Sequence, residues 1–507
     1  MSYAAFDERF AAINDLLNIA NLLTWDFRSM MPPGGAETRG KQMATLTGMA
    51  RDLLLSDDTA RRVEAARKAI ADLPEDSIEA KCVLQAEQAL DYHKRLPADL
   101  LRRRAELNLT GQAVWERARA ASDFSMLAPV FEEHVDICRR LADAVGYEDH
   151  PYDALIAIYE PGATVKSLDK LFAELRAGLS PLLQAVREAE APRDDFLYRD
   201  YPEEGQRAFA RRIAEAYGYD FSRGRLDTAP HPYEISQTRQ DVRITTRYYR
   251  NNIVACLQGT MHEAGHGIYE QQIGPELTRT VLATDLQGLY GVGGISFGVH
   301  ESQSRLWENQ VGRSRGFWQQ NHAALQAQFP EALGDIDAET FYRAFSRVRP
   351  GLIRVEADEL TYDFHIMLRV EFERRLIEGS LKVKDMPGEW NEAMRRDLGM
   401  EVPDDKHGVL QDMHWSAGQF GIFCGYTIGN VIAAQLYQAA LAQDANIGPS
   451  LDRGEYAPLR EWLGEKLHRH GRRYERDEIL TAITGRPMDS TAYIAYLQGK
   501  YTDIYGL

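Results

Sequence analysis

The chain has 507 residues, of which 44% are hydrophobic and 27% are charged, and its formal net charge is −17. This composition predicts a globular protein with a substantial core, and the negative charge argues against binding to nucleic acid or to an anionic membrane surface. The first ten residues contain acidic side chains and lack a basic-then-apolar targeting pattern, so we expect a soluble, cytoplasmic protein.

The first 200 residues have the pattern of amphipathic helices that pack side by side. In each segment, charged residues lie opposite an apolar stripe. Two prolines and two glycines between Met31 and Gly35 predict a turn after the first helix. The expected helices cover residues 6–25, 36–54, 58–73, 76–94, 99–121, 126–145 and 167–190.

The pattern changes after a further predicted helix at 206–217 and a predicted loop at 219–230. Residues 233–235 and 241–249 are rich in β-branched and aromatic side chains, and in the second run apolar and charged residues alternate. Alternation of this kind is typical of a half-buried strand. We therefore expect a small β-sheet in this part of the chain.

The rest of the chain returns to helical patterns, and no repeat, low-complexity tract or linker divides it. The expected helices are 302–328, 338–348, 357–378, 383–398, 420–442, 459–470, 476–484 and 490–505. The sequence thus predicts a mainly α-helical protein with one domain over residues 1–507. Its N-terminal helical part reaches about residue 200, and the part from about 201 to 507 contains the sheet.

Neither the longest apolar run nor the cysteines point to a membrane or an oxidising compartment. The run from Phe420 to Leu436 is interrupted by glycines and polar residues, so it predicts a buried helix rather than a membrane span. The four cysteines, Cys82, Cys138, Cys256 and Cys424, are scattered without metal-binding or redox spacing. We expect them to be reduced thiols.

The stretch from 251 to 274 is predicted to be one helix, and it contains the run His262-Glu263-Ala264-Gly265-His266. On a helix, His262 and His266 are one turn apart on the same side, so both imidazoles can bind one metal ion. Glu263 then lies beside the ion, where a base can take a proton from a water molecule. The alternative is a helix with two ordinary hydrogen-bonded histidines, but the pattern favours a metal hydrolase.

A hydrolytic metal site needs a third protein ligand and one open position. The third histidine of the metzincin pattern would require Gly at position 269 and His at position 272, where this chain has Tyr269 and Gln272. A downstream carboxylate is therefore the remaining option. The candidates are Glu270, Glu276, Asp285, Glu301 and Glu308.

Glu301 is the favoured candidate among these carboxylates. Glu270 is one turn beyond His266, which suits a supporting or a surface position better. Glu301 opens a strongly helical stretch after the glycine-rich segment 288–298, so a second helix can present its carboxylate to the first. We rank Glu308 behind Glu301.

Six motifs, in order from one end of the chain to the other, resemble the M32 family of metallocarboxypeptidases, of the thermostable-carboxypeptidase type. His231-Pro232-Tyr233 has Tyr where the family has Phe. The others are Leu23-Thr24-Trp25-Asp26 with Met31-Pro32-Pro33-Gly34-Gly35-Ala36, Asp241-Val242-Arg243-Ile244-Thr245, His300-Glu301-Ser302-Gln303, Ile353-Arg354-Val355-Glu356-Ala357-Asp358 and Gly408-Val409-Leu410-Gln411-Asp412-Met413-His414-Trp415.

The resemblance implies a neurolysin-like helical fold with a deep active-site groove and a small β-sheet near the metal. It implies a Zn²⁺ enzyme, with Co²⁺ as a substitute, that removes single residues from peptides with a free C-terminus. Broad preference, exclusion of proline and a homodimeric state are further implications. It also implies that His262, His266 and Glu301 are the zinc ligands and that Glu263 is the catalytic base.

The chain departs from the family pattern in two places. The spacing between His266 and Glu301 is longer than usual, which places an insertion within 273–294 that can reshape the groove rim. The segment before Tyr426 lacks the Tyr and Pro that usually precede this tyrosine. The resemblance therefore does not predict its local backbone, although Tyr426 itself is present.

Five further residues are candidates for substrate binding. His231, His414 and Tyr426 could donate hydrogen bonds to the oxyanion that develops during hydrolysis. An exopeptidase must also recognise a terminal carboxylate, which a fixed guanidinium binds through two hydrogen bonds. Arg354 is the first candidate for this task and Arg243 the second.

Each of these candidates has a purely structural alternative. Arginines in helical proteins mostly pair with surface acids, and His414, next to Trp415, could be a packed core histidine. Asp241 and Asp358 are expected only to orient histidines.

Two other functions remain open from the sequence. The first is an oligoendopeptidase on the same scaffold, which would cut internal bonds of short peptides. The second is a catalytically silent protein that binds a metal or a peptide, although the intact Glu263 argues against it. A purely structural helical protein would leave the metal motif unexplained.

Overall fold

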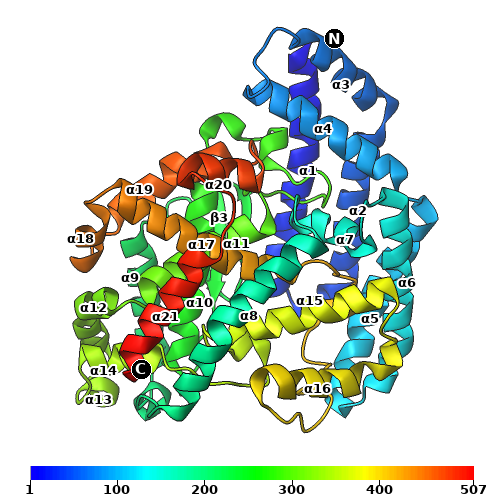
Figure 1. Cartoon of the computed structure of the whole chain (residues 1–507). Helices are drawn as coiled ribbons and strands as arrows, with labels where there is room; N and C mark the ends of the chain where they lie inside the picture. Colours follow the sequence, from blue (N-terminus) through cyan, green and yellow to red (C-terminus); the bar gives the residue numbers. More distant parts are fainter. Residues whose placement is uncertain (1) are drawn as a thin grey trace. The chain divides into compact units, whose positions relative to one another are not determined.

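The computed structural model describes residues 2–507, with the backbone alone for Leu109, and it is mainly α-helical with one small sheet (Figure 1). The chain forms two compact units, each built from three separate stretches. Unit 1 contains the stretch that ends at His93 together with Pro192–Phe345 and Ile432–Met488. Unit 2 contains Lys94–Ala191, Ser346–Val431 and Asp489–Leu507.

Unit 1 combines helices with the three-stranded sheet. Its helices are α1 (Tyr3–Ser29), α2 (Ala36–Leu55), α3 (Asp57–Ala69), α4 (Ile78–Arg95), α9 (Glu203–Tyr217), α10 (Ile253–Gln271), α11 (Phe297–Arg305), α12 (Arg315–Gln328), α13 (Pro330–Leu333), α14 (Ala338–Phe345), α18 (Ile447–Asp452), α19 (Ala457–Lys466) and α20 (Arg476–Thr484). A π-helical segment, Leu306–Gly312, follows α11 directly.

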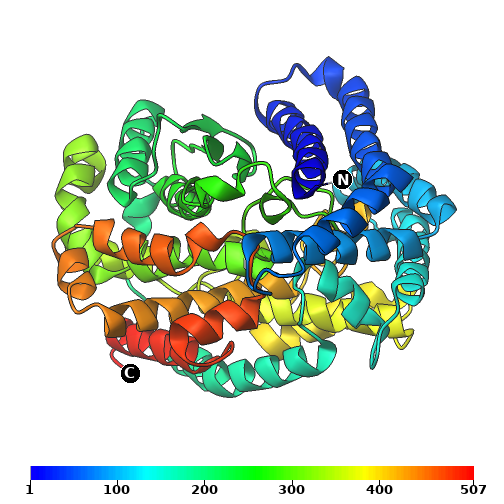
Figure 2. The same cartoon turned by 90° about the horizontal axis from the view of Figure 1, so that it is seen from above.

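The sheet of unit 1 has the strand order β1–β3–β2. Strand β1 (Gly224–Thr228) runs parallel to β3 (Asp241–Thr246), and β2 (Glu234–Thr238) runs antiparallel to it. Val242 and Ile244 are fully buried, as the alternating pattern predicts for one face of a strand. This sheet lies against α10 (Figure 2), so the helix that carries the histidine pair is packed on a rigid support.

Unit 2 is helical. It contains α5 (Ala98–Ala121), α6 (Ala128–Val145), α7 (Pro151–Tyr159), α8 (Val165–Glu188), α15 (Tyr362–Glu378), α16 (Met386–Leu398) and α21 (Thr491–Tyr505). Helix α17 (Cys424–Gln443) begins in unit 2 and ends in unit 1. Helix α15 is buried along most of its length, and the large side chains around it include Trp390 and Trp415.

The predicted mainly α-helical fold with a small sheet is confirmed, and several local predictions are wrong. The predicted loop 219–230 contains β1, because its pairing with β3 is a long-range contact that leaves no local alternation. The predicted continuous helix 302–328 is interrupted by the π-helical segment and the turn before Arg315. The single domain over 1–507 stays a prediction.

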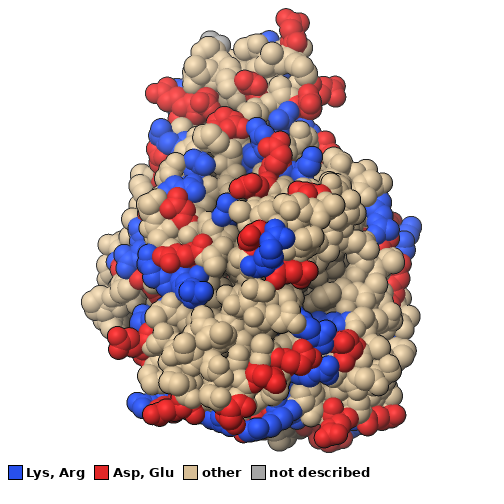
Figure 3. All heavy atoms as spheres, turned by 90° about the vertical axis from the view of Figure 1, so that its left-hand side faces the viewer, with Lys and Arg blue, Asp and Glu red and all other residues tan. Residues whose placement is uncertain are grey.

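Among residues 2–507, no helix combines the length and the apolar character that crossing a membrane requires. The apolar run after Phe420 forms the buried helix α17, which begins four residues later than predicted, at Cys424. Acidic and basic side chains are interspersed over the face shown in Figure 3. The four cysteines are buried and free.

Candidate functional site

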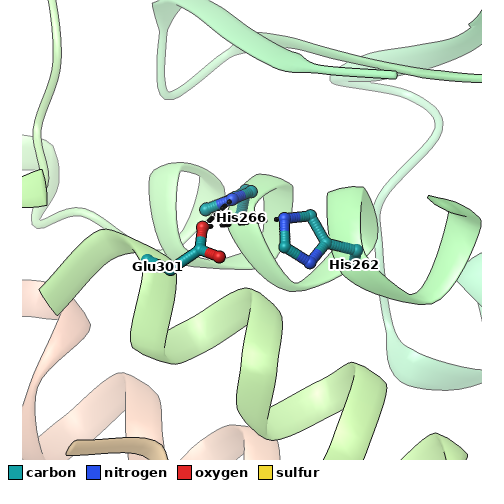
Figure 4. A group of neighbouring side chains, drawn as sticks. All are labelled: His262, His266 and Glu301. Atoms are coloured by element: carbon teal, nitrogen blue, oxygen red, sulfur yellow. Dashed lines mark ion pairs between the residues drawn. The ribbon is translucent and has the colours of Figure 1, made fainter. Parts of the chain in front are cut away.

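Helix α10 places both histidines of the motif on one side. Asn252 caps the helix, because its side chain accepts hydrogen bonds from the backbone N–H groups of Val254 (3.0 Å) and Ala255 (3.4 Å). Residues at three- and four-residue steps are fully buried, so the helix cannot rotate about its axis without exposing them. His262 and His266 therefore project together from the remaining face (Figure 4).

Helix α11 supplies the carboxylate. The side chain of Ser296 caps this helix by accepting from Val299 N at 3.2 Å. Gly265 of α10 lets the two helices approach closely, because a Cβ atom there would lie 2.5 Å from the carbonyl oxygen of Gln303. The buried side chain of Glu301 then points at both imidazoles.

The three side chains meet at distances that suit one metal ion. The Oε2 atom of Glu301 lies 3.6 Å from Nε2 of His262 and 3.4 Å from Nε2 of His266. Ligand atoms about 2.1 Å from a tetrahedral zinc ion stand roughly 3.4 Å from one another. Two imidazole nitrogens and one carboxylate oxygen are also the donor types of catalytic zinc sites, so His262, His266 and Glu301 fit this metal.

The outer nitrogen of each imidazole is also bound. Nδ1 of His262 lies 2.9 Å from Oε2 of Glu308, and a carboxylate can only accept, so this nitrogen carries the proton. Nδ1 of His266 lies 2.6 Å from Nδ1 of His300, whose Nε2 donates to Glu270 at 3.1 Å. His300 therefore accepts from His266, and in the neutral form of each imidazole the metal-facing Nε2 atom keeps a free lone pair.

Arginines fix the two carboxylates. Arg305 donates to Oε1 of Glu301 at 2.7 Å and lies 3.3 Å from Oε2 of Glu308. Arg313 donates to Oε1 of Glu308 at 2.9 Å. Both glutamates are buried, so these contacts offset the free-energy cost of placing their charges inside the protein.

The same contacts determine the pKa values of these carboxyl groups. Burial raises the pKa of Glu301, but the charges of Arg305 and His262 outweigh burial and hold it well below its ordinary value. Burial likewise raises the pKa of Glu308, and the same two neighbours together with Arg313 bring it down to about 2. Both groups are therefore ionised at neutral pH.

The motif residues differ in their protonation. Burial lowers the pKa of His266 to about 3, so its imidazole is neutral, as a metal ligand must be. For His262, burial acts in the same direction, but the negative charges of Glu301 and Glu308 outweigh it and raise the pKa. Burial raises the pKa of Glu263 to about 8, although the neighbouring His262 lowers it.

A second group of predicted residues lies in unit 2, around Asp412. Arg354 is buried, and its Nε and Nη2 atoms donate to Oδ1 of Asp412 at 3.0 and 2.8 Å. Arg369 donates to the other oxygen, Oδ2, at 2.6 Å. Two buried guanidinium groups thus share one carboxylate, and their positive charges hold the pKa of Asp412 far below its usual range against the effect of burial.

His414 and Tyr426 belong to this second group. Nδ1 of His414 lies 3.8 Å from Oδ1 of Asp412, and its ring packs against that of Phe423 at a centroid distance of 4.8 Å and an interplanar angle of 52°. The guanidinium of Arg354 lies 5.2 Å from the ring centre of Tyr426. The structure therefore brings Arg354, His414 and Tyr426 together.

Arg243 and Asp358 lie outside both groups, and His231 is at the protein surface. Arg243 on β3 donates to both oxygens of Asp241 at 2.8 Å and covers the ring of Trp25, so its guanidinium is already bound through two hydrogen bonds. His231 is exposed in the bend before β2. Asp358 accepts from Thr361 and from backbone N–H groups, and no hydrogen bond to a histidine is present among its contacts in residues 2–507.

Two residues with clear roles in the geometry, Arg305 and His300, were not singled out from the sequence, and Glu308 has another role than the one considered. Arg305 follows Glu301 by one helical turn, a spacing that signals an ion pair on one face. Glu308 was considered only as a ligand, whereas it binds the far side of His262. His300 gave no signal of its own, because its contact with His266 is made between two helices.

Known proteins similar to this chain include metallopeptidases that match it along its whole length. The family model described as carboxypeptidase Taq (M32) metallopeptidase matches residues 5–501. Thermostable carboxypeptidase 1 of Thermus thermophilus is 38% identical over 505 residues, which cover 97% of this chain and 96% of that protein. Carboxypeptidase 1 of Bacillus subtilis is 36% identical over 485 residues, with 96% and 95% covered.

A solved structure agrees with these sequence matches. The M32 carboxypeptidase from Deinococcus radiodurans superposes with a TM-score of 0.95 at 38% identity, covering 100% of this chain and 99% of that chain. Identity above 30% along entire chains, together with the same fold, confirms the resemblance drawn from the six motifs. The chain belongs to the carboxypeptidase Taq (M32) family and is a metallocarboxypeptidase.

Proposed function

We propose that this metallocarboxypeptidase depends on Zn²⁺ and removes single residues from the C-termini of peptides, with broad preference and without releasing proline. Membership of a metallopeptidase family implies a metal cofactor. One observation supports the proposal most directly. Two imidazole nitrogens and one carboxylate oxygen lie within 4.8 Å of one another, and Glu263, which is also buried, follows the first histidine.

His262, His266 and Glu301 would hold the metal. When bound, zinc supplies a Lewis acid that polarises the peptide carbonyl and makes water a stronger acid. Co²⁺ accepts the same nitrogen and oxygen ligands and is expected to substitute. The neutral form of His266 and the ionised form of Glu301 are the forms that such ligands require.

Glu263 is proposed as the base. It follows His262 directly and is 5% exposed, so its carboxylate lies beside the ligand cluster in a site with little bulk water. There it takes a proton from the attacking water and later returns it to the amine that leaves. Burial favours this exchange, because a carboxylate that is poorly solvated is a stronger base.

Arg354 is proposed to bind the terminal carboxylate of the substrate. Two arginines around the single carboxylate of Asp412 leave one unbalanced positive charge in a buried setting, which favours a further anion. Nη1 of Arg354 donates to Tyr362 at 3.1 Å, which fixes the plane of the guanidinium. Arg243 ranks behind it, because Asp241 already occupies its two donors.

His414 and Tyr426 are proposed as donors to the developing oxyanion, together with His231. His414 and Tyr426 gain support from their place beside Arg354. His231 rests on the family motif alone. A homodimer in the cytoplasm completes the proposal, and light scattering of the purified protein would measure the oligomeric state.

Mass spectrometry of a peptide mixture over time tests the function. Each peptide is supplied with a free C-terminus and as its C-terminally amidated twin, and one member of the set carries a C-terminal proline. We expect stepwise loss of single residues from the free peptides, a stop at proline, and slow cleavage of the amidated twins. Zn²⁺ or Co²⁺ added after chelation should restore activity.

Glu263→Gln is the matched inactive variant for this assay. Loss of a general base typically costs a factor of about 10² to 10⁴ in rate, while the metal content should remain. Glu204→Gln, an exposed glutamate on α9, serves as the control. Internal cuts in both members of each pair would instead identify an oligoendopeptidase, and metal binding without any cleavage would identify a silent binding protein.

A further inference from the structure

Unit 2 contains a cavity whose lining residues take no part in either group of candidate site residues. Its volume is about 300 Å³, which is large enough for a small organic ligand. Tyr152 of α7, Leu168 and Phe172 of α8, and Met367 and Val370 of α15 form its apolar part, and all five are buried. Helices α8 and α15, which provide most of the lining, are labelled in Figure 1.

Charged side chains surround this apolar floor, two of each sign. Asp169 and Arg176 come from α8, and Glu371 and Arg374 come from α15. Their side chains are between 25% and 58% exposed, so they stand at the mouth of the cavity while the apolar residues lie below them. Because the mouth of the cavity carries positive and negative side chains, it suits a zwitterionic ligand, which has one positive and one negative group.

Arg374 has an unused side that fits a carboxylate. Its Nη1 donates to both oxygens of Asp169, at 2.8 and 3.1 Å. Its Nε is buried without an acceptor in the described part of the chain, and Nη2 makes no hydrogen bond to residues 2–507 either. Nε and Nη2 form the edge of a guanidinium that binds a carboxylate through two parallel hydrogen bonds.

We propose that this cavity binds a free α-amino acid with a large apolar side chain. The carboxylate of the ligand binds Nε and Nη2 of Arg374, and its ammonium group binds Asp169, whose carboxylate can accept further hydrogen bonds. The side chain of the ligand packs on Phe172 and Met367. A fatty acid has no ammonium group to donate to Asp169, and a long peptide would exceed the volume.

The ligand is of the same chemical class as the product that a carboxypeptidase releases. A route to the proposed substrate-binding residues starts at the cavity floor, where the hydroxyl of Tyr152 donates to Glu373 at 2.5 Å. Glu373 also accepts from Nε1 of Trp415 and from the backbone N–H of Gly421, both at 2.7 Å. A ligand that shifts Tyr152 therefore acts on the segment that carries His414 and Tyr426.

Binding is tested by titrating the metal-loaded, full-length protein with leucine in a calorimeter. The variant Ala173→Trp fills the cavity from an exposed lining position. Wild-type protein should therefore bind one equivalent of leucine more than this variant. Arg374→Gln should weaken this binding about tenfold or more, because it removes a charge-assisted pair of hydrogen bonds. Arg395→Gln, an exposed arginine of α16 paired with Glu401, is the matched control.

Two analogues of leucine test the recognition of each charge. Leucinamide lacks the carboxylate and 4-methylpentanoate lacks the ammonium group, and each should bind the cavity about tenfold more weakly or worse. Equal numbers of leucine equivalents in wild-type protein and Ala173→Trp would overturn the site. Unchanged leucine binding in Arg374→Gln would overturn the proposed recognition of the carboxylate.

The coupling to substrate binding rests on the proposed roles of His414 and Tyr426, and it is tested separately. In wild-type protein, leucine should change the KM for a peptide by about fivefold or more. The change should be smaller in Ala173→Trp, where leucine can act only outside the cavity. Tyr152→Phe should bind leucine normally but lose this response. A response that persists in Tyr152→Phe would overturn the route through Glu373. The cleavage of free and amidated peptides without leucine reports on the proposed function independently.

Discussion

His262 and His266 each use their two ring nitrogens for different tasks. The Nε2 atoms face Glu301, while the Nδ1 atoms are held by Glu308 and His300. The hydrogen bonds from the two Nδ1 atoms end at carboxylates, at Glu308 directly and at Glu270 through His300. A carboxylate can only accept, so the proton stays on Nδ1 of each imidazole. The site is thus prepared for a cation by residues that do not touch it.

Glu308→Gln tests this arrangement at the level of one side chain. Gln can still accept from Nδ1 of His262, but the negative charge is lost, so we expect metal affinity to fall about 10-fold or more. Competition with a chelator of known affinity would measure the change. Glu331→Gln, an exposed glutamate of α13, should leave the affinity unaltered. Equal affinities in wild type and Glu308→Gln would contradict the role assigned to Glu308.

Arg354→Ala tests the recognition of the terminal carboxylate. We expect kcat/KM to fall at least about tenfold more for peptides with free C-termini than for their amidated twins, since a charged hydrogen-bonded contact is lost only with the former. Asp412 keeps Arg369 as a partner, which limits the damage to the fold. Equal losses for both kinds of peptide would move carboxylate recognition to another residue.

The sequence could predict the residues of the metal motif and the favoured third ligand. His262, Glu263 and His266 follow from helical spacing, and Glu301 followed from the start of a second helix. His300 could not be found in this way, because its two partners, His266 and Glu270, lie on another helix. The arrangement around Asp412 likewise joins segments that are far apart in the chain.

At the scale of elements, the contact between α10 and α11 determines the geometry of the metal site. Gly265 faces the backbone of α11 so closely that a Cβ atom would lie 2.5 Å from Gln303 O and 2.7 Å from Ser304 Cα. Neither backbone atom can rotate away as a side chain can. The distance between the histidines and Glu301 therefore depends on the absence of a side chain at this position.

Gly265→Ala should separate the two helices. We expect a loss of about 1–3 kcal/mol in stability from overpacking, despite the higher helix propensity of alanine, and a marked loss of metal affinity. Gly259→Ala in the same helix is the matched control, since its new Cβ would meet its nearest neighbours at 3.3 Å. Thermal unfolding and chelator competition would measure both effects. A variant as stable and as metal-bound as the control would refute the argument.

Elements with strong local patterns were predicted well, and elements formed by long-range contacts were not. Helices α2, α5 and α20 match their predicted ranges to within one residue. Strand β1 was missed because its partner β3 lies farther along the chain. The π-helical segment Leu306–Gly312 was missed because its residues have an ordinary helical composition. It contains Glu308, which accepts a hydrogen bond from Arg313.

At the scale of the whole molecule, buried charge makes stability depend on pH. Burial raises the pKa of Glu373 from 4.5 to about 7, although Tyr152, Gly421, Trp415 and Arg369 oppose this effect. Between these two values the folded protein holds a proton that the unfolded chain releases. This contribution to stability is therefore complete below pH 4.5 and is lost as the pH rises through 7.

Glu373→Gln should remove this dependence. Relative to the variant, wild-type protein should lose on the order of 3 kcal/mol of unfolding free energy between pH 4.5 and pH 8. Denaturant unfolding at a series of pH values would measure the difference, with the exposed Glu392→Gln as the control. Parallel pH profiles for wild type and Glu373→Gln would show that Glu373 is ionised throughout.

Metal removal should act on one unit more than on the other. A bound ion stabilises the conformation that binds it, so chelation should increase amide hydrogen exchange in α10 and α11 of unit 1. Helices α15 and α16 of unit 2 should change far less. Hydrogen-exchange mass spectrometry with and without Zn²⁺ would compare them. An equal increase in all four helices would mean that the two units open together.

The interleaving of the two units has a consequence for synthesis on the ribosome. When the nascent chain has passed Glu301, every proposed metal ligand has been made, yet the stretch Ile432–Met488 of the same unit is still to come. Unit 2 likewise waits for the last residues after Asp489. Neither unit can be completed before its last stretch has been made, so each remains exposed to aggregation or proteolysis during much of its synthesis.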